Sequence, residues 1–222
     1  MKIDDNIRHF QSLLPEGVEL VAVSKFHPAE AIRLAYDAGQ RKFGESRVAE
    51  LLGKIEQLPG DIEWHFIGHL QTNKVKQIVG KVSLIESVDS QRLLDLIDRI
   101  SEEKGVTTNV LMQVHVAREE TKFGWSPEEL IEYFSEKRYR SLKSTRLCGI
   151  MGMATNTGDR EKVAGDFLRL RTIYDSIREM PETDKSVFNL LSMGMSGDWP
   201  LAVEEGANIV RVGSAIFGDR IY

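Results

Sequence analysis

Eight short, apolar, strand-like segments recur along this chain of 222 residues, and a helical pattern lies between each segment and the next. Strands that alternate with helices form a parallel sheet with right-handed crossovers, and such strands are apolar throughout because both faces are buried. Eight units of this kind predict a single closed (β/α)8 TIM-type barrel, with a doubly wound open sheet as the alternative. The segments are residues 20–26, 41–45, 63–68, 84–88, 109–117, 147–154, 188–195 and 208–217.

The helical patterns carry signals of their own. Residues 3–14 are amphipathic and precede the first strand segment, which predicts an extra N-terminal helix. Ser126 and Glu129 have the spacing of a capping box, and residues 160–180 show a long apolar stripe. No Pro-, Gly- or Ser-rich linker divides the chain, so we expect residues 1–222 to form a single domain.

Charge, apolar content and cysteine content argue against several classes of protein. The net charge of −5 argues against a general nucleic-acid binder or a binder of anionic membranes. No segment is apolar for long enough to span a bilayer, and the N-terminus has no apolar signal region. The single cysteine, Cys148, lies in an apolar run, which suits a buried, inert thiol in a reducing compartment. We expect a cytoplasmic protein, and a monomer because no apolar stripe is left over.

Lys25 stands at the carboxyl end of the first strand segment, and Pro28 opens a helical pattern directly after it. Because side chains alternate along a strand, Lys25 should share a face with Val21 and Val23. An unpaired charge on an apolar face is unfavourable, so this lysine needs an explanation. In a barrel of this class the active site lies at the carboxyl ends of the strands.

Small residues gather at the ends of the last two strand segments, where such barrels commonly bind phosphate. Glycines let backbone N–H groups approach an anion, and serine adds a donor. Met195 is either a core residue or a ligand contact. Arg211 either pairs with a core acid or contacts a ligand at the barrel mouth. The small residues concerned are Ser196, Gly213 and Ser214.

An inward lysine, a phosphate-binding loop pair and an inward arginine together suit pyridoxal 5'-phosphate. Its aldehyde forms a Schiff base with a neutral amine, and desolvation lowers the pKa of a lysine and so favours that form. An acid beside the pyridine nitrogen keeps the ring protonated as an electron sink. Arginine, which is always charged, leaves the nitrogen unprotonated and the sink weak.

Six motifs resemble those of the pyridoxal phosphate homeostasis proteins (YggS/PROSC type), in the same order. They are AVSKFHP, FGES, WHFIGHLQTNK, GIMGMA, LSMGMSGD and VRVGSAIFG, and they extend over residues 22–218. The resemblance implies a barrel similar to the N-terminal domain of alanine racemase. It also implies a role in buffering or delivering the cofactor, with apo enzymes that use pyridoxal phosphate as candidate partners.

The same resemblance implies roles for individual residues. Lys25 would carry the cofactor covalently, and Arg211 would lie near the ring nitrogen. The phosphate would be contacted near Ser196, Gly213 and Ser214.

Other candidate residues flank these motifs. The family usually has asparagine where this chain has Ser46, so the contact of that side chain to the cofactor is expected to need a water molecule. His65 should line the mouth, with a satisfied core histidine as the alternative. His65 and His69 are about 13 Å apart along an extended strand, too far to share a metal ion, and no metal is expected. Lys122 and Gly124 form either a cover over the site or a solvated turn.

Two functions are weighed for this chain. Racemisation needs an acid–base group on each face of the cofactor, and Lys25 could serve one face. In alanine racemases the other group is a tyrosine from a partner subunit, and each chain carries a further β-domain. The sequence stops at Tyr222 without that domain, so we expect an open site that suits release and transfer. A non-catalytic carrier is therefore favoured over a racemase or related enzyme.

Overall fold

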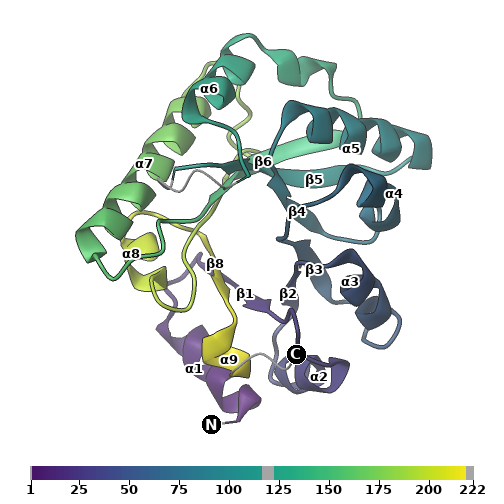
Figure 1. The fold of residues 1–222 in the computed structure, drawn as a ribbon, viewed down its shortest axis with the longest axis vertical. Helices are drawn as coiled ribbons and strands as arrows, with labels where there is room; N and C mark the ends of the chain where they lie inside the picture. The colour runs from purple at the N-terminus through teal and green to yellow at the C-terminus, as the bar shows by residue number, and fades with distance from the viewer. Residues whose placement is uncertain (1, 117–122, 219–222) are drawn as a thin grey trace.

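Eight parallel strands close into a barrel in the computed structural model, which describes residues 2–116 and 123–218. Each strand pairs with the next along the chain, and β8 pairs with β1 to complete the ring, with Val21 opposite Arg211. Figure 1 shows the ring of strands with the helices outside it. The predicted (β/α)8 barrel is confirmed, and the open sheet is excluded. The strands are β1 (Glu19–Val23), β2 (Lys42–Glu45), β3 (Glu63–Phe66), β4 (Leu84–Val88), β5 (Thr108–Val114), β6 (Thr145–Gly152), β7 (Leu190–Ser192) and β8 (Ile209–Val212).

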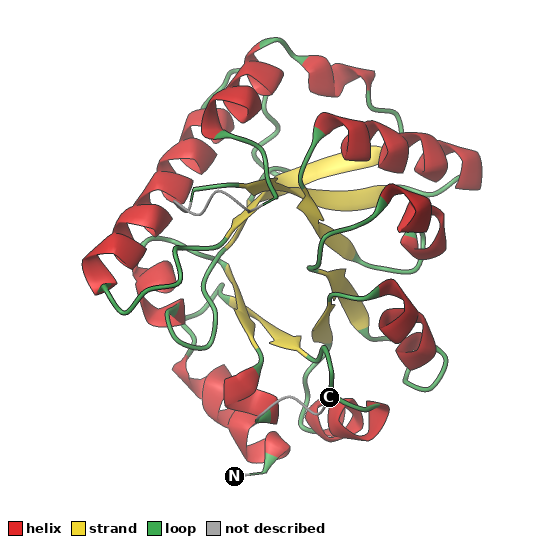
Figure 2. Cartoon of the chain, viewed as in Figure 1, coloured by secondary structure: helices red, strands yellow, loops and turns green. Residues whose placement is uncertain are grey.

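Helices follow the strands in turn, and the expected extra helix, α1, precedes β1 (Figure 2). The capping box of Ser126 and Glu129 is formed at the start of α6, with both reciprocal hydrogen bonds present. None of the described helices is long and apolar enough to cross a membrane. The helices are α1 (Ile3–Leu13), α2 (Ala29–Asp37), α3 (Val48–Ile55), η1 (Thr72–Lys74), α4 (Val75–Ile78), α5 (Gln91–Lys104), α6 (Pro127–Ser135), η2 (Arg138–Ser141), α7 (Arg160–Arg178), α8 (Trp199–Glu204) and α9 (Ser214–Phe217).

Two apolar cores hold the barrel. The larger core lies between the strands and the helices. The smaller core fills the barrel interior on the side nearer the amino ends of the strands. Cys148 belongs to the interior core, where burial raises the pKa of its thiol, as expected for an inert cysteine. The other buried members of the interior core are Val21, Leu84, Leu111, Met151 and Ile209.

The interior changes from apolar to polar toward the carboxyl ends of the strands. Leu84 and Ile209 are members of the interior core, and two residues farther along the same strands stand Glu86 and Arg211. Because side chains two apart share a face, these polar groups form the next layer of the interior. Charged side chains therefore lie inside the barrel directly below its mouth, the open end at which the strands finish.

Three predicted strand boundaries are wrong near the mouth. β1 ends at Val23, so Lys25 lies in the following turn and not in the strand. β7 ends at Ser192, before Gly194, which has a φ of 92°. Most of the second half of the predicted last strand is the helix α9, because a short apolar run does not by itself distinguish strand from helix.

Candidate functional site

A pocket of about 260 Å³ opens at the carboxyl ends of the strands. It is lined mainly by the segments that follow β1, β6, β7 and β8, with Ile67 from the end of β3. Six of the eight residues predicted for the site lie together on its wall. They are Lys25, Met195, Ser196, Arg211, Gly213 and Ser214.

Lys25 reaches this pocket from a tight turn. The carbonyl oxygen of Ser24 accepts a hydrogen bond from the backbone N–H of His27 at 3.1 Å. Phe26 occupies the third position of the turn with a φ of 68°. This combination matches a type II turn, which favours glycine at that position. Lys25 and Val23 both line the pocket. Val23 is buried, and Lys25 is half-buried.

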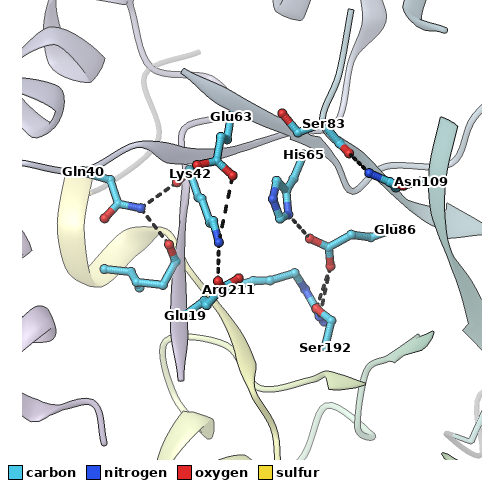
Figure 3. Close-up of polar contacts among 11 residues, drawn as sticks. Glu19, Gln40, Lys42, Glu63, His65, Ser83, Glu86, Asn109, Ser192 and Arg211 are labelled. Carbon is cyan, nitrogen blue, oxygen red and sulfur yellow. Dashed lines mark hydrogen bonds and ion pairs between the residues drawn. The ribbon is translucent and has the colours of Figure 1, made fainter. Parts of the chain in front are cut away.

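Arg211 lines the pocket and belongs to a buried polar network, which Figure 3 shows. Its guanidinium donates to Ser192 Oγ at 2.6 Å and to the carbonyl oxygen of Gly152 at 2.9 Å. Glu86 Oε2 accepts from Ser192 Oγ at 2.6 Å and lies 3.7 Å from Arg211 Nη1. Arg211 therefore pairs with a core acid, as one of the two alternatives expected, and it also lines the pocket.

His65 completes the network from β3, with its Nδ1 2.6 Å from Glu86 Oε1. Burial alone would raise the pKa of Glu86, but the hydrogen bonds and charges of His65, Arg211 and Ser192 bring it below its ordinary value. Glu86 is therefore an anion that holds the guanidinium in place. His65 is 3% exposed and does not line the pocket, which fits the alternative of a satisfied core histidine.

Glu86 and Ser192 are site residues that sequence reasoning missed. The signal for Glu86 was a single acid in the otherwise uncharged strand LIESV. A charged side chain in a strand buried on both faces needs a buried partner, and Arg211 is the partner found. Ser192 gave no comparable signal, because serine is common in strands and loops alike.

Another part of the pocket wall is built from the loops after β7 and β8. The backbone N–H of Gly213 donates to Ser196 Oγ at 3.2 Å, which joins the two loops. A side chain at Gly213 would lie 3.2 Å from the carbonyl oxygen of Val23, so glycine permits this close approach. Ser214 then begins α9, whose first N–H groups have no partner within the helix. Such groups are suited to an anion.

Ser46 is not part of the pocket wall. It follows β2 and lies against Gly68, where an added side chain would come within 2.4 Å of the Ser46 carbonyl oxygen. His69 bonds to Asp89 and not to His65, and no cluster of potential metal ligands occurs among residues 2–116 and 123–218. Gly124 packs on the backbone of His115, away from the pocket, and Lys122 lies outside the described residues.

Comparisons with known proteins agree on one family. The family described as alanine racemase, N-terminal domain, matches residues 1–221. The pyridoxal phosphate homeostasis protein of Aquifex aeolicus is 42% identical over 92% of this chain and 88% of its own length. PipY of Synechococcus elongatus PCC7942, solved with PLP bound, has a TM-score of 0.86 at 38% identity, over 97% of this chain and all of that one.

A more distant likeness concerns the fold alone. An alanine racemase of Clostridium difficile 630 has a TM-score of 0.78 at 16% identity, and it covers 97% of this chain but 55% of the racemase.

Proposed function

The chain belongs to the family of pyridoxal phosphate homeostasis proteins, with the fold of the alanine racemase N-terminal domain, and on this premise we propose that it binds pyridoxal 5'-phosphate in the pocket at the barrel mouth. Its role would be to buffer the cofactor and deliver it. The observation that carries the proposal is that one pocket brings together a lysine amine, a buried guanidinium and a small-residue wall.

The pocket residues fit the chemical groups of this cofactor. When bound, pyridoxal phosphate supplies an aldehyde that condenses with an amine. Lys25 would provide that amine, and Arg211, held by Ser192, would stay charged beside the ring nitrogen. Ser196 and Ser214 would hold the phosphate through hydroxyl and N–H donors, and Gly213, whose N–H donates to Ser196 Oγ, would help to place the Ser196 hydroxyl. Met195, 40% exposed, would cover part of the ligand.

Two predicted contacts take indirect forms in this proposal. His65 would act through Glu86, which it hydrogen-bonds, and not by touching the cofactor. Ser46 would reach the cofactor only through water. Neither residue is on the pocket wall.

We propose a carrier and assign no catalytic residue. A racemase would need a second acid–base group on the far face of the cofactor, and the likeness to alanine racemases is of fold alone. The recipients would be apo enzymes that use pyridoxal phosphate. We further propose that residues 1–222 form one domain, and that the protein is a cytoplasmic monomer without affinity for nucleic acid.

The test is to replace Lys25 and to follow the covalently bound cofactor. Lys25→Ala should abolish the visible absorption band of the protein incubated with pyridoxal phosphate, and leave no label on peptide mass mapping after borohydride reduction. Lys143→Ala, at an exposed lysine, is the matched control and should bind as the wild type does. Circular dichroism should be the same for all three proteins. Covalent cofactor retained by Lys25→Ala would refute the assignment of Lys25.

A further inference from the structure

A cluster of buried charges lies behind the turn that carries Lys25, on the outer side of the barrel wall. Gly44 faces the interior, where an added side chain would meet Val21, so the neighbouring Glu45 faces outward to α3. There Lys54 Nζ donates to Glu45 Oε1 at 2.7 Å and to Glu50 Oε1 at 2.6 Å. Lys54 is 5% exposed and Glu45 is fully buried.

This cluster contacts the backbone on both sides of Lys25. On one side, Lys54 Nζ also donates to the carbonyl oxygen of Ser24 at 2.9 Å. On the other side, Glu50 Oε1 accepts from the backbone N–H of Phe26 at 2.6 Å. Because an ammonium has three hydrogens, the three contacts of Lys54 use its full donor capacity.

The turn needs this support because of Phe26. Its φ of 68° lies in the left-handed region, which disfavours residues with a side chain. A strained residue of this kind persists where its surroundings fix it, and such residues cluster at functional sites. Besides the bond to Glu50, the guanidinium of Arg47 lies 4.5 Å from the centre of the Phe26 ring. Three residues at the start of α3 and within it thus act on a single turn.

We propose that Glu50 and Lys54 are positioning residues for cofactor binding, which fix the turn of residues 24–27 so that the Lys25 amine points into the pocket. The inference rests on the proposed function, which supplies the reason for aiming this amine. Lysine has four rotatable side-chain bonds, so a fixed backbone reduces the orientations that the amine must sample before it meets an aldehyde.

A role in stability alone would not explain which backbone groups Glu50 and Lys54 contact. A buried ion pair can often be replaced by apolar residues without loss of stability, so stability alone does not require this cluster. Here one carboxylate and one ammonium bond to the two backbone groups that flank the reactive residue. That placement controls the direction of Lys25, which an apolar contact would not do.

Glu50→Ala tests the proposal. It removes the acceptor of the Phe26 N–H but leaves Glu45 to pair with Lys54. The Glu50 side chain is 21% exposed, so the variant should fold. Glu50→Gln keeps an acceptor oxygen and should restore most of what Glu50→Ala loses. Glu56→Ala, at an exposed carboxylate that follows the same helix, is the matched control.

Two measurements are made on each full-length protein. Exchange of the Phe26 amide hydrogen, followed by NMR without cofactor, reports the turn itself. Stopped-flow absorption reports the rate of covalent pyridoxal phosphate uptake. We expect Glu50→Ala to exchange faster at Phe26 and to take up the cofactor about tenfold more slowly, with Glu50→Gln and Glu56→Ala near the wild type.

The outcomes separate this proposal from the proposed function. If the wild type binds at Lys25, and Glu50→Ala matches it in both uptake and amide exchange, the positioning role is refuted. Faster exchange with unchanged uptake also refutes it, since the turn would then be irrelevant to binding. If the wild type takes up no pyridoxal phosphate, the proposed function fails, and with it the reason for aiming the amine.

Discussion

At the scale of single residues, the site depends on charges placed out of reach of water. Glu86 is buried with Arg211, and Glu45 is buried with Lys54. Each carboxylate is tied to a residue or turn that lines the pocket. The two networks therefore act on different parts of the pocket wall, since one contacts the Arg211 guanidinium and the other contacts the backbone on both sides of Lys25.

Glu86 should make the stability of the protein depend on pH. Its pKa is lowered in the folded state, so its contribution to folding is fully present above its unfolded value, near 4.3, and is lost as the pH falls through the folded pKa. Glu86→Gln also leaves Arg211 without its anion. We expect this variant to unfold more easily than the wild type at pH 7, by about 3–5 kcal/mol, and the difference to shrink below about pH 4.3.

Urea unfolding of the cofactor-free protein between pH 3 and 7 measures this difference. Glu56→Gln, at an exposed carboxylate, should follow the wild-type curve throughout. A gap between Glu86→Gln and the wild type that stays constant over the whole pH range would show that Glu86 is not the group responsible.

At the scale of elements, the barrel could be predicted from the sequence, but the exact ends of the strands at its mouth could not. Apolar strand patterns and amphipathic helix patterns are properties of whole segments, so they predicted the eight strands and the extra helix α1. The helical state of residues 214–217 depends on Gly213 and on packing against α1, which is information from distant parts of the chain. For the same reason the buried partners Glu86 and Lys54 were not found in advance.

Helix α1 supports the wall of the pocket that is proposed to hold phosphate. Its Asn6, which is 7% exposed, donates from Nδ2 to the carbonyl oxygen of Ile216 in α9 at 2.8 Å. Figure 1 shows the two helices side by side. Asn6→Ala leaves that carbonyl unpaired, which costs about 1–3 kcal/mol and loosens α9.

We therefore expect Asn6→Ala to weaken pyridoxal phosphate binding by about fivefold or more, because part of that cost is borne by the phosphate-binding wall. Equilibrium titration followed by absorption measures the change. Ser12→Ala, at an exposed position of the same helix, should bind as the wild type does. Equal affinities for the two variants would mean that α1 does not act on the pocket.

At the scale of the whole molecule, side chains form successive layers along the barrel axis. Their order explains how the pocket can have buried walls and still be open to solvent. Apolar side chains fill the lower interior, charged networks occupy the layer above, and the pocket lies beyond them with Met195 and Ser214 exposed at its rim. Buried side chains therefore line the inner end of the pocket, and exposed side chains lie at its rim. This arrangement suits a protein that must hold a cofactor and also release it.

We expect the protein to be a monomer. The large exposed apolar side chains of its described residues lie on five separate elements or loops, and a permanent dimer interface usually gathers such side chains into one patch. We expect light scattering after gel filtration to give one species of 25.1 kDa, with or without pyridoxal phosphate. A species of twice that mass at micromolar concentration would contradict a monomer and would direct attention to contacts near the mouth. The exposed side chains are Leu13, Leu34, Phe123, Leu168 and Met195.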